Sequence, residues 1–139
     1  MVRYSLGCFT LVLSFIATGC GGAASDDTPE LGTVSGTVTL DGSPVPKATV
    51  TFKPEAGGRP SSGTTDDQGY YELQYSLNNN GAVPGKHTVR ITTATTITNE
   101  AGEDTDVPEK IPAKYNSETE LTEEVKPTSQ TIDFALKSE

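Results

Sequence analysis

The segment from Val34 to Pro54 constrains the fold more than any other, because it alternates apolar and polar residues on both sides of a turn. Small or apolar residues take every second position: Val34, Gly36, Val38 and Leu40 in the first arm, and Ala48, Val50 and Phe52 in the second. This period of two is typical of a strand with one buried face. Between the arms, the run DGSP from Asp41 to Pro44 favours a tight turn. The segment therefore predicts a β-hairpin that places four side chains in the core: Val38, Leu40, Val50 and Phe52.

Shorter runs of the same kind follow along the chain. They are Ser62 to Thr65, Tyr70 to Tyr75, Gly85 to Thr92, Leu121 to Val125, and Ile132 to Leu136. The run from Asp66 to Gly69 reads as a turn that makes a second hairpin. Thr93 to Pro108 loses clean alternation, so we expect a long exposed connection there. Seven short strands with polar turns predict an all-β fold, namely a seven-stranded antiparallel β-sandwich with Greek-key character.

Length and charge limit the function classes. The chain has 139 residues, which is enough for one domain with a modest core. Its formal net charge is −9 and its ten basic residues are scattered. A nucleic-acid surface needs clustered Lys and Arg, so we expect no nucleic-acid partner.

The first residues have the features of an export signal. Arg3 provides a short basic start, and the apolar run from Leu6 to Ile16 is too short to span a bilayer. The run ATGC that ends at Cys20 resembles the bacterial lipoprotein lipobox, with Ala17 where Leu is commonest. The resemblance implies that residues 1–19 are removed and that Cys20 is acylated. The rival interpretation is an ordinary secretory signal cleaved nearby.

Lipidation at Cys20 would leave no free thiol in the mature chain, because Cys8 lies inside the discarded segment. Residues 20–32 then form the lipidated cysteine and a flexible tether, rich in small and acidic residues from Gly21 to Leu31. Residues 33–137 form the domain. By the sorting pattern of such lipoproteins, Gly21 after the cysteine favours the outer membrane.

Several motifs recur in a characteristic order. They are G-x-V from Gly36 to Val38, D-G-x-P-x-x-x-A-x-V-x-F from Asp41 to Phe52, a Thr-Asp and Gly run with alternating apolar residues from Thr65 to Leu73, and P-G-x-x-x-V from Pro84 to Val89. This order resembles the carboxypeptidase regulatory-like domain. The tail from Ile111 to Leu136 resembles the end of small exported lipoproteins built from that domain. The resemblance implies a transthyretin-like, or prealbumin-like, seven-stranded sandwich that serves as an accessory module without chemistry of its own.

Residues typical of catalysis are sparse. His87 is the only histidine, and its place in the pattern favours a packed structural residue over a catalytic one. The nucleophile-elbow pattern G-x-S-x-G is absent. Transthyretin-like folds include a hydrolase of a cyclic urea metabolite, but its several histidines and its C-terminal Tyr-Arg-Gly-Ser are missing. We therefore expect a protein that is not an enzyme and that needs no cofactor.

The sequence also offers three weaker candidates for a binding or modification site. Calcium could bind the acidic run from Glu100 to Asp106, or Asp66 with Asp67, although EF-hand spacing is missing and a solvated loop is favoured. Tyrosines at positions 70, 71 and 75 could contact a sugar, but alternation leaves only Tyr70 outside. An isopeptide bond could join Lys47 or Lys53 to Asp133. None of these is favoured over its structural interpretation.

These observations predict a non-catalytic, lipid-anchored cell-envelope protein whose β-sandwich serves structure or interaction. The alternative is a carbohydrate- or calcium-binding accessory module that acts beside an enzyme. The expected partners are the membrane, through the lipid on Cys20, and an envelope protein or polysaccharide. The expected location is the outer membrane, with the domain in the periplasm or at the cell surface.

Overall fold

The structure is a computed structural model that describes residues 28–139. This part of the chain is built almost entirely of short strands, with the 3-10 helix η1 (Ala113–Tyr115) near its end. The strands are β1 (Val34–Leu40), β2 (Ser43–Pro44), β3 (Thr49–Pro54), β4 (Ser61–Thr64), β5 (Tyr70–Glu72), β6 (Gln74–Ser76), β7 (Asn79–Asn80), β8 (Gly85–Thr92), β9 (Thr95–Thr98), β10 (Asp104–Val107), β11 (Thr122–Val125), β12 (Gln130–Thr131) and β13 (Phe134–Leu136).

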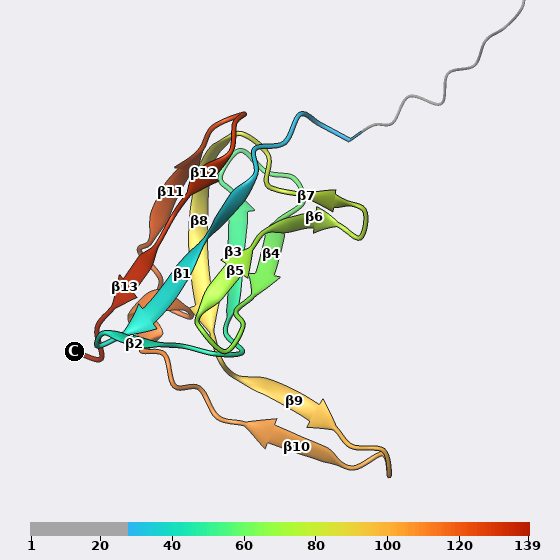
Figure 1. The fold of residues 1–139 in the computed structure, drawn as a ribbon, viewed down its shortest axis with the longest axis vertical. Helices are drawn as coiled ribbons and strands as arrows, with labels where there is room; N and C mark the ends of the chain where they lie inside the picture. The colour runs from blue at the N-terminus through green and yellow to red at the C-terminus, as the bar shows by residue number, and fades with distance from the viewer. Residues whose placement is uncertain (1–27) are drawn as a thin grey trace, which may run out of the picture.

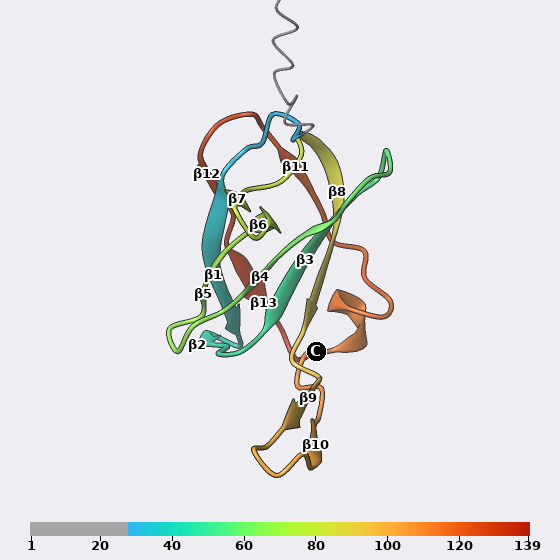
Figure 2. The ribbon, with the colours of Figure 1, turned by 90° about the vertical axis from the view of Figure 1, so that its right-hand side faces the viewer.

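Two sheets pack face to face as a β-sandwich (Figures 1 and 2). One sheet is centred on β1, which pairs with β12 and β13 and, in the antiparallel sense, with β2 and β5. The other sheet has the order β11-β8-β3-β4-β6-β7. The expectation of an all-β sandwich is therefore confirmed.

The predicted opening hairpin is wrong. The turn itself exists, since Asp41 and Gly42 both have positive φ, at 51° and 84°. It leads only to the two-residue strand β2, which pairs with the end of β1. The chain then crosses to the other sheet, where β3 pairs with β4 and β8. Alternation identified the buried face of each arm correctly, but it carries no information about which strand pairs with which.

The observed arrangement of strands differs in two respects from the predicted sandwich of seven antiparallel strands. β1 runs parallel to β12 and β13, with Val38 opposite Phe134 and Leu40 opposite Leu136. The predicted strand from Tyr70 to Tyr75 divides at Leu73, so that β5 joins the first sheet and β6 the second. The last predicted strand, Ile132 to Leu136, forms β13 only from Phe134, and the two-residue strand β12 precedes it. The division at Leu73 lets one stretch of chain serve both sheets.

The predicted core residues lie where alternation placed them. Val38, Val50 and Phe52 are fully buried, and Leu40 is partly buried against the same cluster. Phe52 lies at the centre, with its ring centroid 5.8 Å from that of His87 and 6.1 Å from that of Phe134. Full burial of a side chain of this size contributes about 1.5–3 kcal/mol. The aromatic contacts join the two sheets across the sandwich.

The connection after Thr93 is a hairpin rather than an irregular loop. β9 and β10 pair in register, with Thr98 opposite Asp104 and Thr95 opposite Val107. The hairpin projects from the end of the sandwich, as both views show (Figures 1 and 2). The prediction that this segment is exposed was correct. The prediction that it has no regular secondary structure was wrong.

Candidate functional site

The projecting hairpin has one polar face built from cross-strand pairs. The Thr96 hydroxyl donates to Asp106 at 2.9 Å, and the Thr98 hydroxyl donates to Asp104 at 2.6 Å. At the tip, the Asn99 side chain donates to Glu103 at 2.9 Å and accepts from the Glu103 backbone N–H at 2.9 Å. Each acidic residue of this face thus has its own local donor. The pairs stabilise a two-stranded element that has no core of its own.

This arrangement bears on the expected calcium site. The carboxylates from Glu103 to Asp106 are bonded to separate donors along the hairpin instead of converging on one point. Asp66 accepts from the N–H groups of Gln68 and Tyr70, which makes it part of its turn. Within residues 28–139, no group of three or more His, Cys, Asp or Glu is placed to hold a metal ion.

Glu109 fastens the two ends of the hairpin to each other. Its Oε1 accepts from the Thr93 N–H at 2.8 Å, the Thr93 hydroxyl at 2.9 Å and the Ile111 N–H at 3.0 Å. Its Oε2 accepts from the Thr92 hydroxyl and the Ala94 N–H. Partial burial acts to raise the pKa of Glu109, but these hydrogen bonds together outweigh it and lower the pKa to about 2. The carboxylate is therefore ionised at neutral pH and holds the hairpin at a defined angle.

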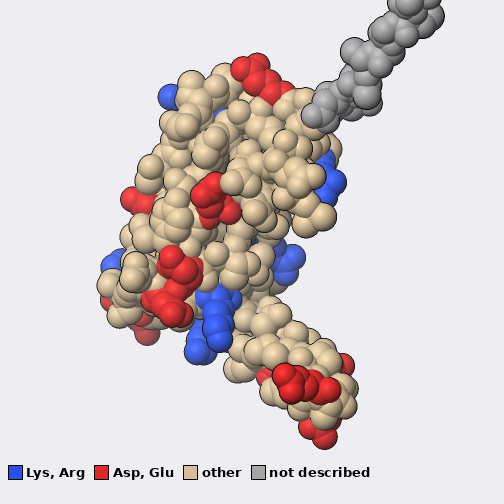
Figure 3. All heavy atoms as spheres, turned by 45° about the vertical axis from the view of Figure 1, so that its right-hand side comes forward, with Lys and Arg blue, Asp and Glu red and all other residues tan. Residues whose placement is uncertain are grey.

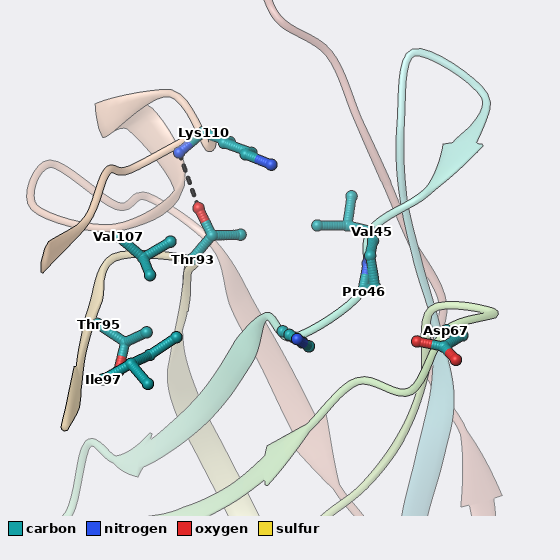
Figure 4. Close-up of a pocket in the computed structure, with 9 residues that line it drawn as sticks. Val45, Pro46, Asp67, Thr93, Thr95, Ile97, Val107 and Lys110 are labelled. Carbon is teal, nitrogen blue, oxygen red and sulfur yellow. Dashed lines mark hydrogen bonds between the residues drawn. The ribbon is translucent and has the colours of Figure 1, made fainter. Parts of the chain in front are cut away.

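The other face of the hairpin borders a groove of about 410 Å³, which we call the hairpin groove (Figure 4). It is lined by Val45, Pro46, Lys47, Asp67, Thr93, Thr95, Ile97, Val107 and Lys110. In Figure 4, Ile97 and Val107 lie on the hairpin side and Val45 and Pro46 on the opposite side. This volume falls within the range of ligand sites in proteins.

The wall opposite the hairpin is held by a buried threonine. Thr65 is 3% exposed, and its hydroxyl donates to the Val45 carbonyl at 2.6 Å and accepts from the Ala48 N–H at 2.8 Å. The Thr65 carbonyl accepts from the Lys47 N–H at 3.0 Å. Lys47 consequently adopts a φ of 57°, in the left-handed region that a residue with a Cβ rarely enters. The loop presents Lys47 to the groove in spite of this backbone strain.

The charges around the groove are mixed. Figure 3 shows acidic atoms on the hairpin and basic atoms on the neighbouring surface of the sandwich. Lys47 and Lys110 line the groove, together with the carboxylate of Asp67. The ion pair of residues 28–139 joins Lys86 to Glu55 at 3.8 Å, so neither groove lysine has an acidic partner within 4 Å in that part of the chain.

His87 is a packed residue, as expected. It is 1% exposed, and its Nε2 lies 2.6 Å from the Val83 carbonyl oxygen, to which it donates as the protonated nitrogen. Its Nδ1 is buried and has no hydrogen-bond partner among the described residues. Because the ring faces Phe52 in the core, it lies away from the hairpin groove.

The other two candidate sites, which the sequence did not favour, are not assembled in residues 28–139. Tyr71 is fully buried and donates to the Ile132 carbonyl at 2.6 Å, while Tyr70 is exposed and Tyr75 lies under Arg59. The three tyrosines therefore form no common surface. Asp133 accepts from the N–H and hydroxyl of Thr37, and neither an ion pair nor a hydrogen bond joins it to Lys47 or Lys53 among residues 28–139.

Cys20, the expected lipidation site, and the signal segment before it lie outside the described residues. Within residues 28–139, no helix has the length and apolar character needed to cross a membrane. Gly32 pairs with Ala82 through two backbone hydrogen bonds of 2.9 Å, so the chain is joined to the sandwich from that residue onward.

Sequence reasoning missed the hairpin groove and Glu109. A signal for the hairpin was present, because Thr95 to Thr98 is rich in β-branched residues and Asn99 to Gly102 has turn residues. The acidic residues between Glu100 and Asp106 favoured an exposed connection instead. No signal pointed to Glu109, whose role depends on Thr92 and Thr93, more than a dozen positions away.

Comparison with known protein families and with curated proteins gives no match. Among solved structures, the chain is similar to BcpA, the major pilin subunit of Bacillus cereus, with 18% identity and a TM-score of 0.41. The match covers 77% of this chain and 30% of the pilin. A variant of the same pilin gives 19% identity and a TM-score of 0.44, over 78% of this chain and 30% of the other. A 9R-lipoxygenase from Cyanothece PCC8801 gives 11% identity and a TM-score of 0.40, over 76% of this chain and 17% of the enzyme.

Proposed function

We propose that this protein is a non-catalytic, lipid-anchored component of the cell envelope whose β-sandwich is an interaction module. The proposed anchor is an acylated Cys20 in the outer membrane, with the domain in the periplasm or at the cell surface. The proposed family is the carboxypeptidase regulatory-like domain with a transthyretin-like fold. Support for the family comes from the order of motifs between Gly36 and Val89 and from the all-β sandwich that contains them.

One geometric observation carries the interaction role. The described chain begins at one end of the sandwich, and the β9–β10 hairpin projects from the other (Figures 1 and 2). A lipid on Cys20 would therefore hold the domain by one end and leave the hairpin groove facing away from the bilayer. Glu109 and Thr65 hold the two sides of the groove, so it is a preformed surface.

The anchor is tested by two matched cysteine substitutions in the full chain. We expect Cys8→Ser to remain in the membrane fraction and to carry the mass of the attached lipid, because Cys8 lies in the discarded signal. Cys20→Ser should be recovered in the soluble fraction without that mass. A lipid mass on Cys20→Ser, or no lipid mass on Cys8→Ser, would contradict the lipid anchor.

A further inference from the structure

The hairpin groove offers an apolar surface that is open to water. Ile97 is 50% exposed, although large aliphatic side chains are usually buried, and Val107 lies beside it on the paired strand. Val45 and Pro46 form the opposite wall (Figure 4). An occupant with apolar side chains would remove these surfaces from water, which is favourable.

The charges at the groove favour an anionic occupant. Lys47 and Lys110 both line it, and neither has an acidic partner within residues 28–139. The chain as a whole carries a net charge of −9. A concave surface with two unpaired ammonium groups therefore differs in the sign of its charge from the molecule as a whole. Their backbone positions are fixed, because the Lys47 N–H bonds to the Thr65 carbonyl and the Lys110 N–H to the Thr93 hydroxyl. Carboxylates pair well with ammonium groups held in this way.

The strands of the hairpin can also bind backbone. β9 and β10 form a two-stranded sheet, so each has one edge without a partner strand in the described part of the chain. An extended segment can add to such an edge through main-chain hydrogen bonds. Its side chains would point alternately to opposite sides. On such an edge, one set of side chains would join Ile97 and Val107 on the groove side, and the other set would lie on the side of Asp104 and Asp106. A segment that lies within the groove can instead turn its apolar residues to Ile97 and Val107 and the carboxylates between them to Lys47 on the opposite wall.

We propose that the hairpin groove binds an extended, acidic segment of another protein, in which carboxylate side chains alternate with apolar ones. This inference rests on the interaction role proposed above and names the chemistry of the partner. It is independent of the lipid on Cys20. Asp67 lies on the far side of the groove from the hairpin and places a negative charge near the occupant (Figure 4).

Fluorescence anisotropy with the full chain in detergent provides the test. The probe is a capped, labelled eight-residue peptide of alternating Asp and Val, compared with Lys-Val and Ser-Val peptides of the same length. We expect the Asp-Val probe to bind about tenfold or more tightly than the Ser-Val peptide, and the Lys-Val peptide to bind more weakly still. Raising the salt concentration should weaken the Asp-Val complex.

Matched charge variants locate the site. Lys47→Glu with Lys110→Glu should weaken binding of the Asp-Val probe about tenfold or more, because two attractive contacts become repulsive. Lys53→Glu with Lys126→Glu makes the same change in net charge at exposed lysines that do not line the groove, and it should leave the affinity within about twofold. Asp67→Asn should tighten binding by about two- to threefold, because it removes a repulsive charge.

Several outcomes would overturn the proposal. They are equal weakening by the two lysine pairs, binding of the Lys-Val peptide as tight as that of the Asp-Val probe, or no binding of any peptide. Preferential binding of polygalacturonate, an acidic polysaccharide, over the Asp-Val probe would also overturn it in favour of a glycan partner. Each of these results would leave the cysteine test of the lipid anchor unaffected, so the two failures are distinguishable.

Discussion

At the scale of single residues, the sandwich depends on a glycine that lets two strands approach closely. A Cβ added to Gly36 on β1 would lie 1.9 Å from the Ile132 carbonyl oxygen and 2.6 Å from its carbon. Both are backbone atoms of the chain between β12 and β13, so a flexible side chain cannot relieve the clash. The parallel pairing of β1 with the C-terminal strands therefore needs glycine at this position.

Gly36→Ala should destabilise the domain by about 3 kcal/mol or more, because the edge of the first sheet must open to make room. Gly42→Ala is the control: its φ is 84° but nothing lies within 4 Å of the added Cβ. We expect only the conformational cost there, about 1 kcal/mol. Urea denaturation measures both values, and equal effects would contradict this interpretation of Gly36.

At Lys47, a substitution should weaken binding of the acidic probe without lowering the stability of the fold. Lys47→Gly removes the strain of a φ of 57°, which is worth about 1 kcal/mol and offsets the greater freedom of glycine in the unfolded chain. We expect it to melt no lower than the natural protein, while Lys47→Ala keeps the strain. Both should weaken the acidic probe. A clear loss of stability in Lys47→Gly would show that this lysine is retained for folding.

Tyr71 joins the first sheet to the C-terminal part of the chain through its hydroxyl. Burial raises the pKa of Tyr71 well above its usual value, and the nearby carboxylates of Asp133 and Glu123 act in the same direction. The group is therefore a donor at all ordinary pH values. Tyr71→Phe leaves the Ile132 carbonyl without this partner and should cost about 1–2 kcal/mol in denaturant unfolding. A change within the error of measurement would mean that water replaces the hydroxyl.

At the scale of elements, the hairpin depends on one carboxylate at its base. The pKa of Glu109 is about 2, below its ordinary value of 4.5. A carboxyl group with a lowered pKa stabilises the folded state above its ordinary pKa, and this contribution disappears as the pH falls from about 4.5 to about 2. The contribution belongs to the hairpin rather than to the core, because its partners are Thr92, Thr93, Ala94 and Ile111.

Glu109→Gln should loosen the hairpin at neutral pH by about 1 kcal/mol, a modest value because the group is exposed and screened by water. Hydrogen exchange at the Thr93 and Ile111 amides measures this, and about fivefold faster exchange is expected. Relative to the exchange rate of an unprotected amide at the same pH, exchange at these amides in the natural protein should accelerate in the same way as the pH falls from about 4.5 to about 2. The variant should show no such change. Glu120→Gln, at an exposed position, is the control. Unchanged exchange in Glu109→Gln would contradict the assigned role.

The strand faces were predictable from sequence and the strand partners were not. Val38, Val50 and Phe52 are buried because each occupies an alternate position of an amphipathic strand, which is a local property. The pairing of β3 with β8 joins residues about forty positions apart, and that of β1 with β13 joins residues almost a hundred apart. Neither leaves a local pattern. A tight turn such as the one at Asp41 therefore does not establish that its two flanking arms pair with each other.

The candidate site was less predictable than the fold. Lys47, Ile97 and Lys110 come from three separate parts of the sequence and line one groove only because the hairpin and the loop after β2 lie side by side. Thr65 and Glu109, which hold the two sides, bond to residues far from them in sequence. A groove of this kind has no motif, since its properties arise from the placement of ordinary residues.

At the scale of the whole molecule, the sandwich separates two ends with different proposed roles. The described chain begins at one end, and the β9–β10 hairpin projects from the other (Figure 2). This hairpin provides one wall of the hairpin groove. The first sheet is closed along one edge by the parallel pairing of β1 with β12 and β13, which links the beginning and the end of the domain. This construction would keep the hairpin groove at the end of the domain that is opposite the proposed membrane anchor.

The central claim is that this groove contacts an acidic partner in the cell envelope. Its most direct test is site-specific photo-crosslinking in living cells, with the photoreactive residue at Ile97 or at Leu77, a control position that is 96% exposed and does not line the groove. We expect one discrete protein adduct at Ile97, lost when Lys47 and Lys110 are replaced by Glu, and none at Leu77. No adduct at Ile97, or an adduct that persists after the charge reversal, would contradict the account.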